Sequence, residues 1–207
     1  MDAATDAADY DAMDHAAVNA TFAADFLSMH RNGGRLLDVG TGTAQIPIEL
    51  ARRDARLHIT AIDLADEMLH LAARNIEAAG FTERIRALKA DASGLNFESH
   101  SFDAVLSNSI IHHIPEPHGC FAEMVRVGRG TFFVRDLLRP DSQHELDHLV
   151  QIYAAGANPH QRQLFADSLQ AALTLDEVRA LVVALGFPAE TVQATSDRHW
   201  TWCVTPS

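Results

Sequence analysis

The stretch DVGTGTA, residues 38–44, directly follows a short apolar segment at 35–39 that has the composition of a strand. Its two glycines, Gly40 and Gly42, allow a tight turn and let the backbone approach a ligand without obstruction by a Cβ atom. A helix-like segment follows at about 44–53. A strand, a glycine-rich turn and a helix in this order predict one unit of a parallel sheet with a ligand site at the turn.

The alternation of strands and helices continues on both sides of this turn. The apolar periodicity predicts helices at 11–30, 44–53, 65–79, 116–127 and 174–185, and strands at 35–39, 57–62, 85–89, 102–106 and 131–134. Residues 192–204 are rich in β-forming residues and supply one or two closing strands. Strands separated by helices of this length indicate a parallel sheet with helices on both faces. We therefore predict an α/β fold: a doubly wound, mostly parallel, Rossmann-like sheet of about seven strands.

The segment 139–173 interrupts this rhythm with two short amphipathic helices that are separated by residues 156–159. We divide the chain into an N-terminal helical lid at 1–34, a ligand-binding core at 35–138, the helical insert at 139–173 and a closing helix with strands at 174–207. All four parts belong to a single domain, because 207 residues are an ordinary length for one domain. The position of the insert makes it the expected lid over a substrate.

Polar residues follow each predicted strand of the core. Asp38 ends the first strand, Asp63 the second and Asp91 the third, while Asn108 and Asp136 follow the fourth and fifth. Ligands of doubly wound sheets bind beyond the carboxyl ends of the strands, where these side chains are expected to gather. A dinucleotide fingerprint needs a third glycine at position 45, which is Gln45, so a pyrophosphate ligand is disfavoured.

The motifs DVGTGTA (38–44), AIDLADEM (61–68), KADASGL (89–95) and FDAVLSNSIIHHI (102–114) resemble those of class I S-adenosylmethionine-dependent methyltransferases. The likeness runs from about residue 35 to residue 136, and Ala44 stands where the family usually has a third glycine. It implies S-adenosyl-L-methionine as the cofactor and methyl transfer as the activity. The cofactor-binding residues that it implies are Asp38, Gly40, Gly42, Asp63, Leu64, Asp91, Ala92 and Asn108.

The same resemblance implies where the acceptor binds and reacts. Asn108, His112, His113 and Asp136 are the candidate catalytic residues, although either histidine could instead pack or cap a turn. Candidate substrate contacts come from the strand end, the N-terminal lid and the insert: Tyr10, Arg135, Tyr153, His160 and Arg162. The segment SNSI at 107–110 lacks the Asn/Asp-Pro-Pro-aromatic pattern of enzymes that methylate nucleobases or glutamine, which favours a small-molecule acceptor.

The composition limits the partners. There are 28 acidic and 16 basic residues, a formal charge of −12, which disfavours nucleic acid and anionic membranes. We see no secretory signal or apolar run of membrane-spanning length, and we expect a cytoplasmic monomer or homodimer. The acceptor, its methylated atom and the oligomeric state remain open from the sequence.

Two other functions remain as alternatives. Residues 144–148 read HELDH, a match to the H-E-x-x-H motif of zinc peptidases. Asp147 puts a charge where those enzymes usually have an uncharged residue, and no third ligand motif follows, so we expect no metal. A protein that binds the cofactor without catalysis is the second alternative, because it would keep the same three aspartates.

Overall fold

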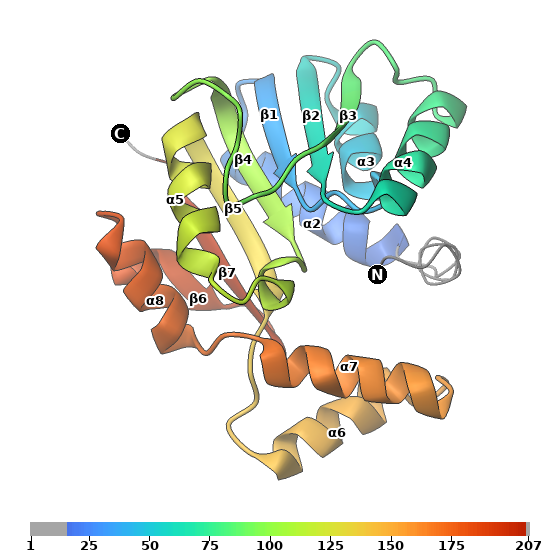
Figure 1. Ribbon diagram of the computed structural model, residues 1–207, viewed down its shortest axis with the longest axis vertical. Helices are drawn as coiled ribbons and strands as arrows, with labels where there is room; N and C mark the ends of the chain where they lie inside the picture. Colours follow the sequence, from blue (N-terminus) through green and yellow to red (C-terminus); the bar gives the residue numbers. More distant parts are fainter. Residues whose placement is uncertain (1–15, 206–207) are drawn as a thin grey trace. The chain divides into compact units, whose positions relative to one another are not determined.

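The computed structural model describes residues 16–205, so the candidate Tyr10 lies outside the described part of the chain. The residues form two compact units (Figure 1). The first unit contains 16–107, 119–133 and 204–205, and the second contains 108–118 and 134–203. The two units are described separately below.

Seven strands form one sheet in the order β3-β2-β1-β4-β5-β7-β6. β1 pairs in parallel with both β2 and β4, so the strand order reverses at β1, as a doubly wound sheet requires. β6 and β7 pair antiparallel, in keeping with the prediction of a mostly parallel sheet of about seven strands. The strands are β1 (Gly34–Val39), β2 (Leu57–Asp63), β3 (Ile85–Lys89), β4 (Phe102–Asn108), β5 (Gly128–Leu137), β6 (Val192–Ala194) and β7 (His199–Val204).

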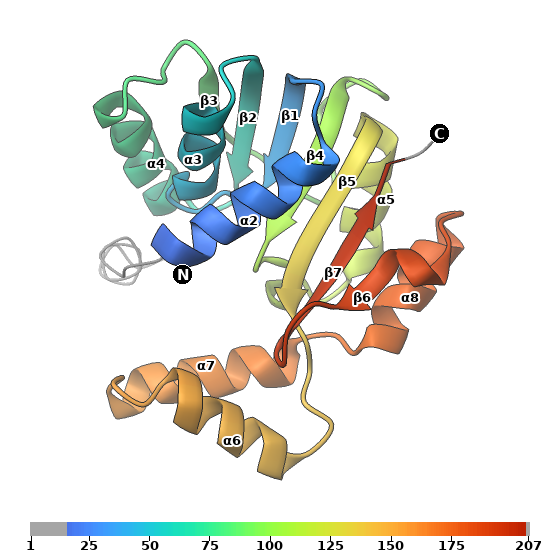
Figure 2. The same ribbon diagram turned by 180° about the vertical axis from the view of Figure 1, so that it is seen from behind.

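Helices cover both faces of the sheet in the first unit. Figures 1 and 2 show α5 over one face and α2 over the opposite face, where α2 packs against α3. Each predicted helix is present, with bounds close to those expected. The helices of this unit are α2 (Ala16–Met29), α3 (Gln45–Arg53), α4 (Asp66–Ala78) and α5 (Pro117–Val127), the last of which begins in the second unit.

α2 is held on the sheet by aromatic side chains. The rings of Phe22 and Phe26 lie 5.1 and 5.9 Å from the ring of Phe133 on β5, both edge to face. Both α2 phenylalanines are buried together with Ala23. Aromatic pairs of this geometry contribute about 0.5–1.5 kcal/mol each beyond the area that they bury. These contacts attach α2 firmly to β5.

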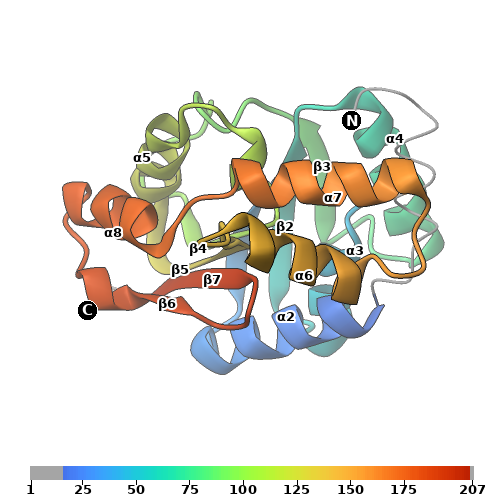
Figure 3. The ribbon, with the colours of Figure 1, turned by 90° about the horizontal axis from the view of Figure 1, so that it is seen from below.

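The second unit contains an antiparallel pair of helices, α6 (Gln143–Tyr153) and α7 (Pro159–Ala171), which Figure 3 shows side by side. Leu146 and Leu149 of α6 pack against Leu169 of α7 in a cluster with Leu137 and Ala172. The apolar face of α6 that we expected to close over a substrate is therefore in contact with α7. The helix α8 (Leu175–Ala184) begins with a capping box formed by Thr174 and Glu177, at the start of the predicted helix 174–185, and packs against β6.

Two short 3-10 helices, η1 (Ile111–His113) and η2 (Ala189–Thr191), complete the second unit. α7 packs against η1. Within residues 16–205, none of the helices combines the length and the apolar character needed to cross a bilayer.

The structure corrects one detail of the sequence analysis. The sequence places Gly128 and Gly130 directly after the predicted helix 116–127, where glycine is typical of a helix end, but both lie inside β5, which runs well beyond the predicted 131–134. A Cβ atom at Gly130 would overlap the carbonyl oxygen of Asp103 on β4, and one at Gly128 would lie 2.5 Å from the Phe132 ring. These glycines are needed for close approach inside the sheet.

We therefore expect Gly130→Ala to lower the free energy of unfolding by about 1–3 kcal/mol, since overpacking of a well-packed interior costs that much. The measurement is chemical denaturation monitored by circular dichroism. Gly94→Ala is the matched control, because a Cβ atom there meets nothing within 4 Å. Equal stabilities of the two variants would contradict the close contact at β5.

Candidate functional site

The glycine turn after β1 adopts a left-handed backbone at alternate residues. The φ angles are +74° at Gly40, +55° at Gly42 and +62° at Ala44. The amides of Gly40 and Thr41 donate to the carbonyl of Ile62 at 2.9 and 2.8 Å, which fixes the turn to the end of β2. Ala44 adopts the left-handed conformation that a glycine adopts freely. An alanine in this conformation costs roughly 1–2 kcal/mol.

Asp63 connects this turn to the next helix. One oxygen, Oδ2, accepts from the Gly42 amide at 2.8 Å, and the other, Oδ1, accepts from the Ala65 amide at 3.0 Å. Each carboxylate oxygen has further lone pairs, so the group can still accept from two neighbouring hydroxyls. Leu64 follows with 62% of its surface exposed, which leaves an apolar side chain beside the carboxylate. This arrangement fits a ribose and the ring attached to it.

Asp38 is a buried acid that lacks a cationic partner in the described residues. Its side chain is 2% exposed. Burial raises the pKa of Asp38 to about 7, helped by the negative charge of Asp63 and opposed by the nearby Thr41 hydroxyl. The Thr41 oxygen is itself buried and makes no hydrogen bond of good geometry within residues 16–205. A bound ammonium group would satisfy the Asp38 carboxylate, so this pair fits the amino-acid end of S-adenosyl-L-methionine.

Asp91 closes a tight turn after β3. Its Oδ1 accepts from the amide and the hydroxyl of Ser93, at 2.8 and 2.7 Å. These hydrogen bonds lower the pKa of Asp91, so the exposed carboxylate is ionised at neutral pH. Ala92 lies between Asp91 and Ser93 in the sequence. The register pairs Asp63 with Lys89 and Val39 with Ile62, so the ends of β1, β2 and β3 lie at one edge of the sheet.

The second unit contains the other group of candidate residues. Asp136 is 1% exposed and accepts three hydrogen bonds, all at 2.6 Å: from the amide of Ile111, from the ring Nδ1 of His112 and from the amide of Leu137. The His113 ring lies 4.0 Å from the His112 ring, centre to centre. The structure therefore brings His112, His113 and Asp136 together as expected. Asn108 ends β4 and begins this unit.

The remaining acceptor candidates are bound to other parts of the second unit. Tyr153 donates to Asp197 at 2.6 Å, and the Arg198 guanidinium lies 3.4 Å above the centre of the Tyr153 ring. Arg162 donates to the carbonyls of Ala154, Ala155 and Ala157, and so fixes the end of α6. Arg135 donates to Thr201 at 3.0 Å, while His160 is exposed.

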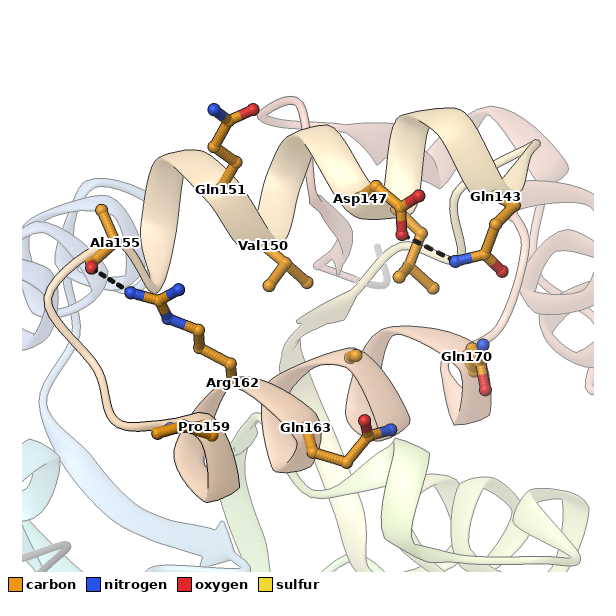
Figure 4. A pocket seen from close by; sticks show the side chains of 11 residues that line it. Gln143, Asp147, Val150, Gln151, Ala155, Pro159, Arg162, Gln163 and Gln170 are labelled. Carbon is orange, nitrogen blue, oxygen red and sulfur yellow. Dashed lines mark hydrogen bonds between the residues drawn. The ribbon is translucent and has the colours of Figure 1, made fainter.

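A groove of about 650 Å³ lies between α6 and α7 (Figure 4). Arg162 and Ala155 are joined at one end of it, and Gln143 donates to Asp147 at 2.8 Å near the other. The groove contains Arg162 but none of the expected cofactor-binding residues. Its lining residues are Gln143, Leu146, Asp147, Val150, Gln151, Ala155, Pro159, Arg162, Gln163, Ala166 and Gln170.

His199, at the start of β7, is interpreted from the sequence as a structural residue rather than a candidate for the site. Its Nδ1 lies 2.8 Å from the Ser196 hydroxyl. Burial lowers the pKa of His199 to about 4, aided by the positive charges of Arg198 and Arg135, so this ring is neutral at physiological pH. The Asp136 charge also acts on it. β7 is the neighbour of β5 in the sheet, which brings this histidine near Asp136, and no local motif indicates it.

The H-E-x-x-H stretch lies on α6, where His144 and His148 are exposed. Within residues 16–205, no group of three or more histidine, cysteine, aspartate or glutamate side chains is arranged to hold a metal ion. Glu145 accepts from the Asp141 amide at 2.9 Å near the start of the same helix. The geometry thus gives no support to a third ligand for a zinc ion.

Comparison with known proteins gives a family match for the core. Residues 37–133 match the family model described as a methyltransferase domain. The chain is 34% identical over 101 residues to a phosphatidylethanolamine N-methyltransferase of Cereibacter sphaeroides, which is 49% of this chain and 48% of that protein. It is 33% identical over 95 residues to the ubiquinone/menaquinone biosynthesis C-methyltransferase UbiE of Geotalea daltonii, covering 45% of this chain and 40% of that protein. The matched part is therefore about half the length of these relatives or less.

Solved structures share the fold over a longer part of the chain. A SAM-dependent methyltransferase from Aquifex aeolicus superimposes with a TM-score of 0.70 at 14% identity, and the match covers 98% of both chains. The structure described as Haemonchus contortus phospholethanolamine N-methyltransferase 2, in complex with phosphomonomethylethanolamine and S-adenosylhomocysteine, gives a TM-score of 0.65 at 20% identity. That match covers 83% of this chain and 37% of the other. These likenesses confirm the doubly wound fold.

We expect Asp63→Ala to weaken the binding of S-adenosyl-L-methionine at least tenfold. Hydrogen bonds to a charged group contribute about 1.5–3 kcal/mol each, and the substitution also removes the acceptor of the Gly42 amide. Isothermal titration calorimetry measures the change. Asp66→Ala is the control, because Asp66 is an exposed acid that pairs with Lys89 at 2.6 Å. Equal affinities of the two variants would remove Asp63 from the site.

The raised pKa of Asp38 predicts a pH-dependent cost to stability. Its carboxyl is protonated in the folded and unfolded states below about pH 4, but between pH 4 and 7 only the unfolded state ionises freely. Ionising the buried group at higher pH therefore destabilises the fold. We expect Asp38→Asn without cofactor to be more stable than the natural protein at pH 8, by up to roughly 4 kcal/mol, and equally stable at pH 4.

Thermal unfolding at both pH values tests this expectation. The cofactor supplies the missing cation, so its affinity for the natural protein should rise between pH 6 and 8. Asp38→Asn should lose both the affinity and its pH dependence. A stability difference that is the same at pH 4 and pH 8 would contradict the buried, cation-free carboxylate.

Proposed function

We propose that this chain, whose residues 37–133 match the model of a methyltransferase domain, is a class I S-adenosylmethionine-dependent methyltransferase that transfers a methyl group to a small-molecule acceptor. Its cofactor is S-adenosyl-L-methionine. The observation that carries the proposal is the hydrogen bond from Gly42 to Asp63, which joins the glycine turn to a carboxylate suited to ribose hydroxyls. The activity of the whole protein is a proposal because its relatives are matched over only part of their length.

The cofactor-binding roles are assigned as follows. Asp38 pairs with the ammonium group, and the backbone of the turn at 40–42 accommodates the amino-acid end. Asp63 accepts from the ribose hydroxyls, and Leu64 packs on the adenine ring. The ionised Asp91 accepts from the adenine amino group, with the Ala92 amide beside it. In this assignment each polar part of the cofactor, from the ammonium group through the ribose to the adenine, has a carboxylate to bind it, and the apolar adenine face has a leucine.

The cofactor supplies an activated methyl group on a positively charged sulfur. The protein then has to hold the acceptor atom in line with that methyl group, and such positioning can contribute roughly 7–11 kcal/mol to lowering the barrier. Buried surroundings exclude water that would compete with the acceptor. Asn108, at the end of β4, is assigned to this region and to the methyl-donating end of the cofactor. His112, His113 and Asp136 are the other catalytic candidates.

A small acceptor is supported by charge and by the residues after β4. The net charge of −12 disfavours polynucleotides, and residues 107–110 lack the pattern associated with nucleobase methylation. We assign Arg135, Tyr153, His160 and Arg162 to acceptor selection, directly or through the loops that they hold. Tyr10 keeps the role expected from the sequence. A cytoplasmic location and a monomeric or homodimeric state are part of the same proposal.

The test is transfer of a radiolabelled methyl group from S-adenosyl-L-methionine to a panel of phenols, primary amines and active-methylene compounds, with tRNA and a peptide mixture in parallel. We expect label in a small molecule, and none with Asp63→Ala. A metal chelator should leave the activity intact, because residues 144–148 are not a zinc site in this proposal. Label in tRNA or peptide alone, chelator-sensitive peptide cleavage, or cofactor binding without any transfer would each reject the proposal.

A further inference from the structure

We propose that the groove between α6 and α7 is the surface through which two copies of this chain associate, related by a two-fold axis that sets the groove of one copy against the groove of the other. The resulting dimer is weak and reversible. This inference does not depend on the methyl transfer proposed above, and it selects the homodimer from the two oligomeric states named there.

The groove has an apolar floor that extends the core of the helix pair. Val150 of α6 and Ala166 of α7 line the groove and also pack on the buried leucine cluster of the second unit. Both side chains are only partly buried. Each helix therefore presents apolar surface on two sides, one toward its neighbour and one toward the groove. Helix pairs of this kind can be completed by a second pair, as in a four-helix bundle.

Two charged side chains stand at opposite ends of the groove (Figure 4). At one end Asp147 accepts a hydrogen bond from Gln143, and it pairs with no cation in residues 16–205. At the other end Arg162 donates through Nε and Nη2 to three backbone carbonyls, and it pairs with no carboxylate in that part of the chain. The groove therefore has one negative end and one positive end.

A second copy of the chain supplies the complement of this charge pattern. A two-fold axis through the middle of the groove exchanges its ends, so Asp147 of each copy faces Arg162 of the other copy. Because the interface is symmetric, this contact occurs twice. A partner with charge of a single sign would meet one attracting end and one repelling end. The charge pattern therefore favours a second copy over an acidic or a basic partner.

The other polar side chains that line the groove are amides. They are Gln143 and Gln151 of α6 and Gln163 and Gln170 of α7. An amide group both donates and accepts hydrogen bonds, so one glutamine can bind another without a change of protonation. A surface lined by glutamines is therefore complementary to its own copy, whereas a row of like charges would repel its copy.

The size of the helix pair sets the strength of the association. α6 has 11 residues and α7 has 13. At about 1.5 Å per residue and about 10 Å across each helix, their common face measures roughly 400 Å² per copy, or about 800 Å² for both. Stable interfaces bury about 1,200–2,000 Å² in total. We therefore expect a weak dimer, with a Kd on the order of 10–100 µM.

Sedimentation velocity of the whole chain measures this association. The protein is studied from about 5 to about 500 µM in about 0.15 M salt, because the repulsion between chains of charge −12 is then largely screened. We expect a monomer at the lowest concentration and mostly dimer at the highest. Circular dichroism of each variant described below shows whether its helices are retained.

Asp147→Lys tests the charge pattern. It replaces two symmetric attractions with two repulsions, so we expect the Kd of the dimer to rise at least tenfold. Asp167→Lys is the matched control, since it changes the net charge equally at an exposed α7 residue outside the groove. Asp167 accepts from Gln163 at 2.8 Å, just as Asp147 accepts from Gln143 at 2.8 Å. Its Kd should stay within threefold of the natural value.

Cysteine cross-linking tests the two-fold arrangement separately. Val150 lies between Asp147 and Arg162 along the groove (Figure 4), so a two-fold axis there brings Val150→Cys close to its own counterpart. A short bismaleimide should then join two copies of this variant. The control is His148→Cys, an exposed position of α6 outside the groove. The natural protein, with its two free cysteines, is the blank.

The possible results separate the occupants of the groove. A chain that stays monomeric at about 500 µM would overturn the proposal and leave the groove to a ligand or to another protein. Equal effects of Asp147→Lys and Asp167→Lys, or cross-linking of His148→Cys in place of Val150→Cys, would show association through a different surface and also overturn it. A dimer that transfers no methyl group would count against the proposed function alone.

Discussion

The hydrogen bond from the Gly42 amide to Asp63 is the interaction on which the candidate cofactor site depends. It joins the turn after β1 to the end of β2, and the second oxygen of the same carboxylate fixes the first residue before α4. The parallel register of β1 and β2 makes this contact possible, because it brings both strand ends to one edge. A left-handed backbone at Gly40, Gly42 and Ala44 then presents the turn to a ligand.

Two buried aspartates at strand ends illustrate how the same side chain is prepared for different tasks. Asp136 is surrounded by groups of the protein itself, two amides and one imidazole, so both of its oxygens are already hydrogen-bonded. Asp38 is equally buried but pairs with no cation in the described residues, and its pKa is raised to about 7. The first arrangement holds another side chain in place, whereas the second leaves a buried carboxyl group without a compensating cation in the described residues. Burial without compensation is thus an informative sign of a binding site.

Much of the fold could be read from local patterns. The apolar periodicity located the strands β1 to β4 to within a few residues, and the capping box at Thr174 marked the start of α8. The local pattern misleads where a glycine is required by a contact with another strand. Gly128 and Gly130 resemble helix terminators in the sequence, yet they lie inside β5, where a Cβ atom would overlap neighbouring residues. The burial of Phe22 in α2 likewise depends on Phe133, more than 100 residues away.

The sequence by itself determined the order of elements, the glycine turn and the acids that follow the strands, because these depend on backbone preference and on the period of apolar residues within one segment. Only the tertiary structure decided that Nδ1 of His112 contacts Asp136, that Tyr153 and Arg162 are bound to other parts of the second unit, and that His199 is neutral. The partners that decide these states include Asp136, 24 residues from His112, and Asp197, 44 residues from Tyr153. Charge and hydrogen-bond state depend on neighbours in space, and chain folding brings such neighbours together from positions that no local pattern connects.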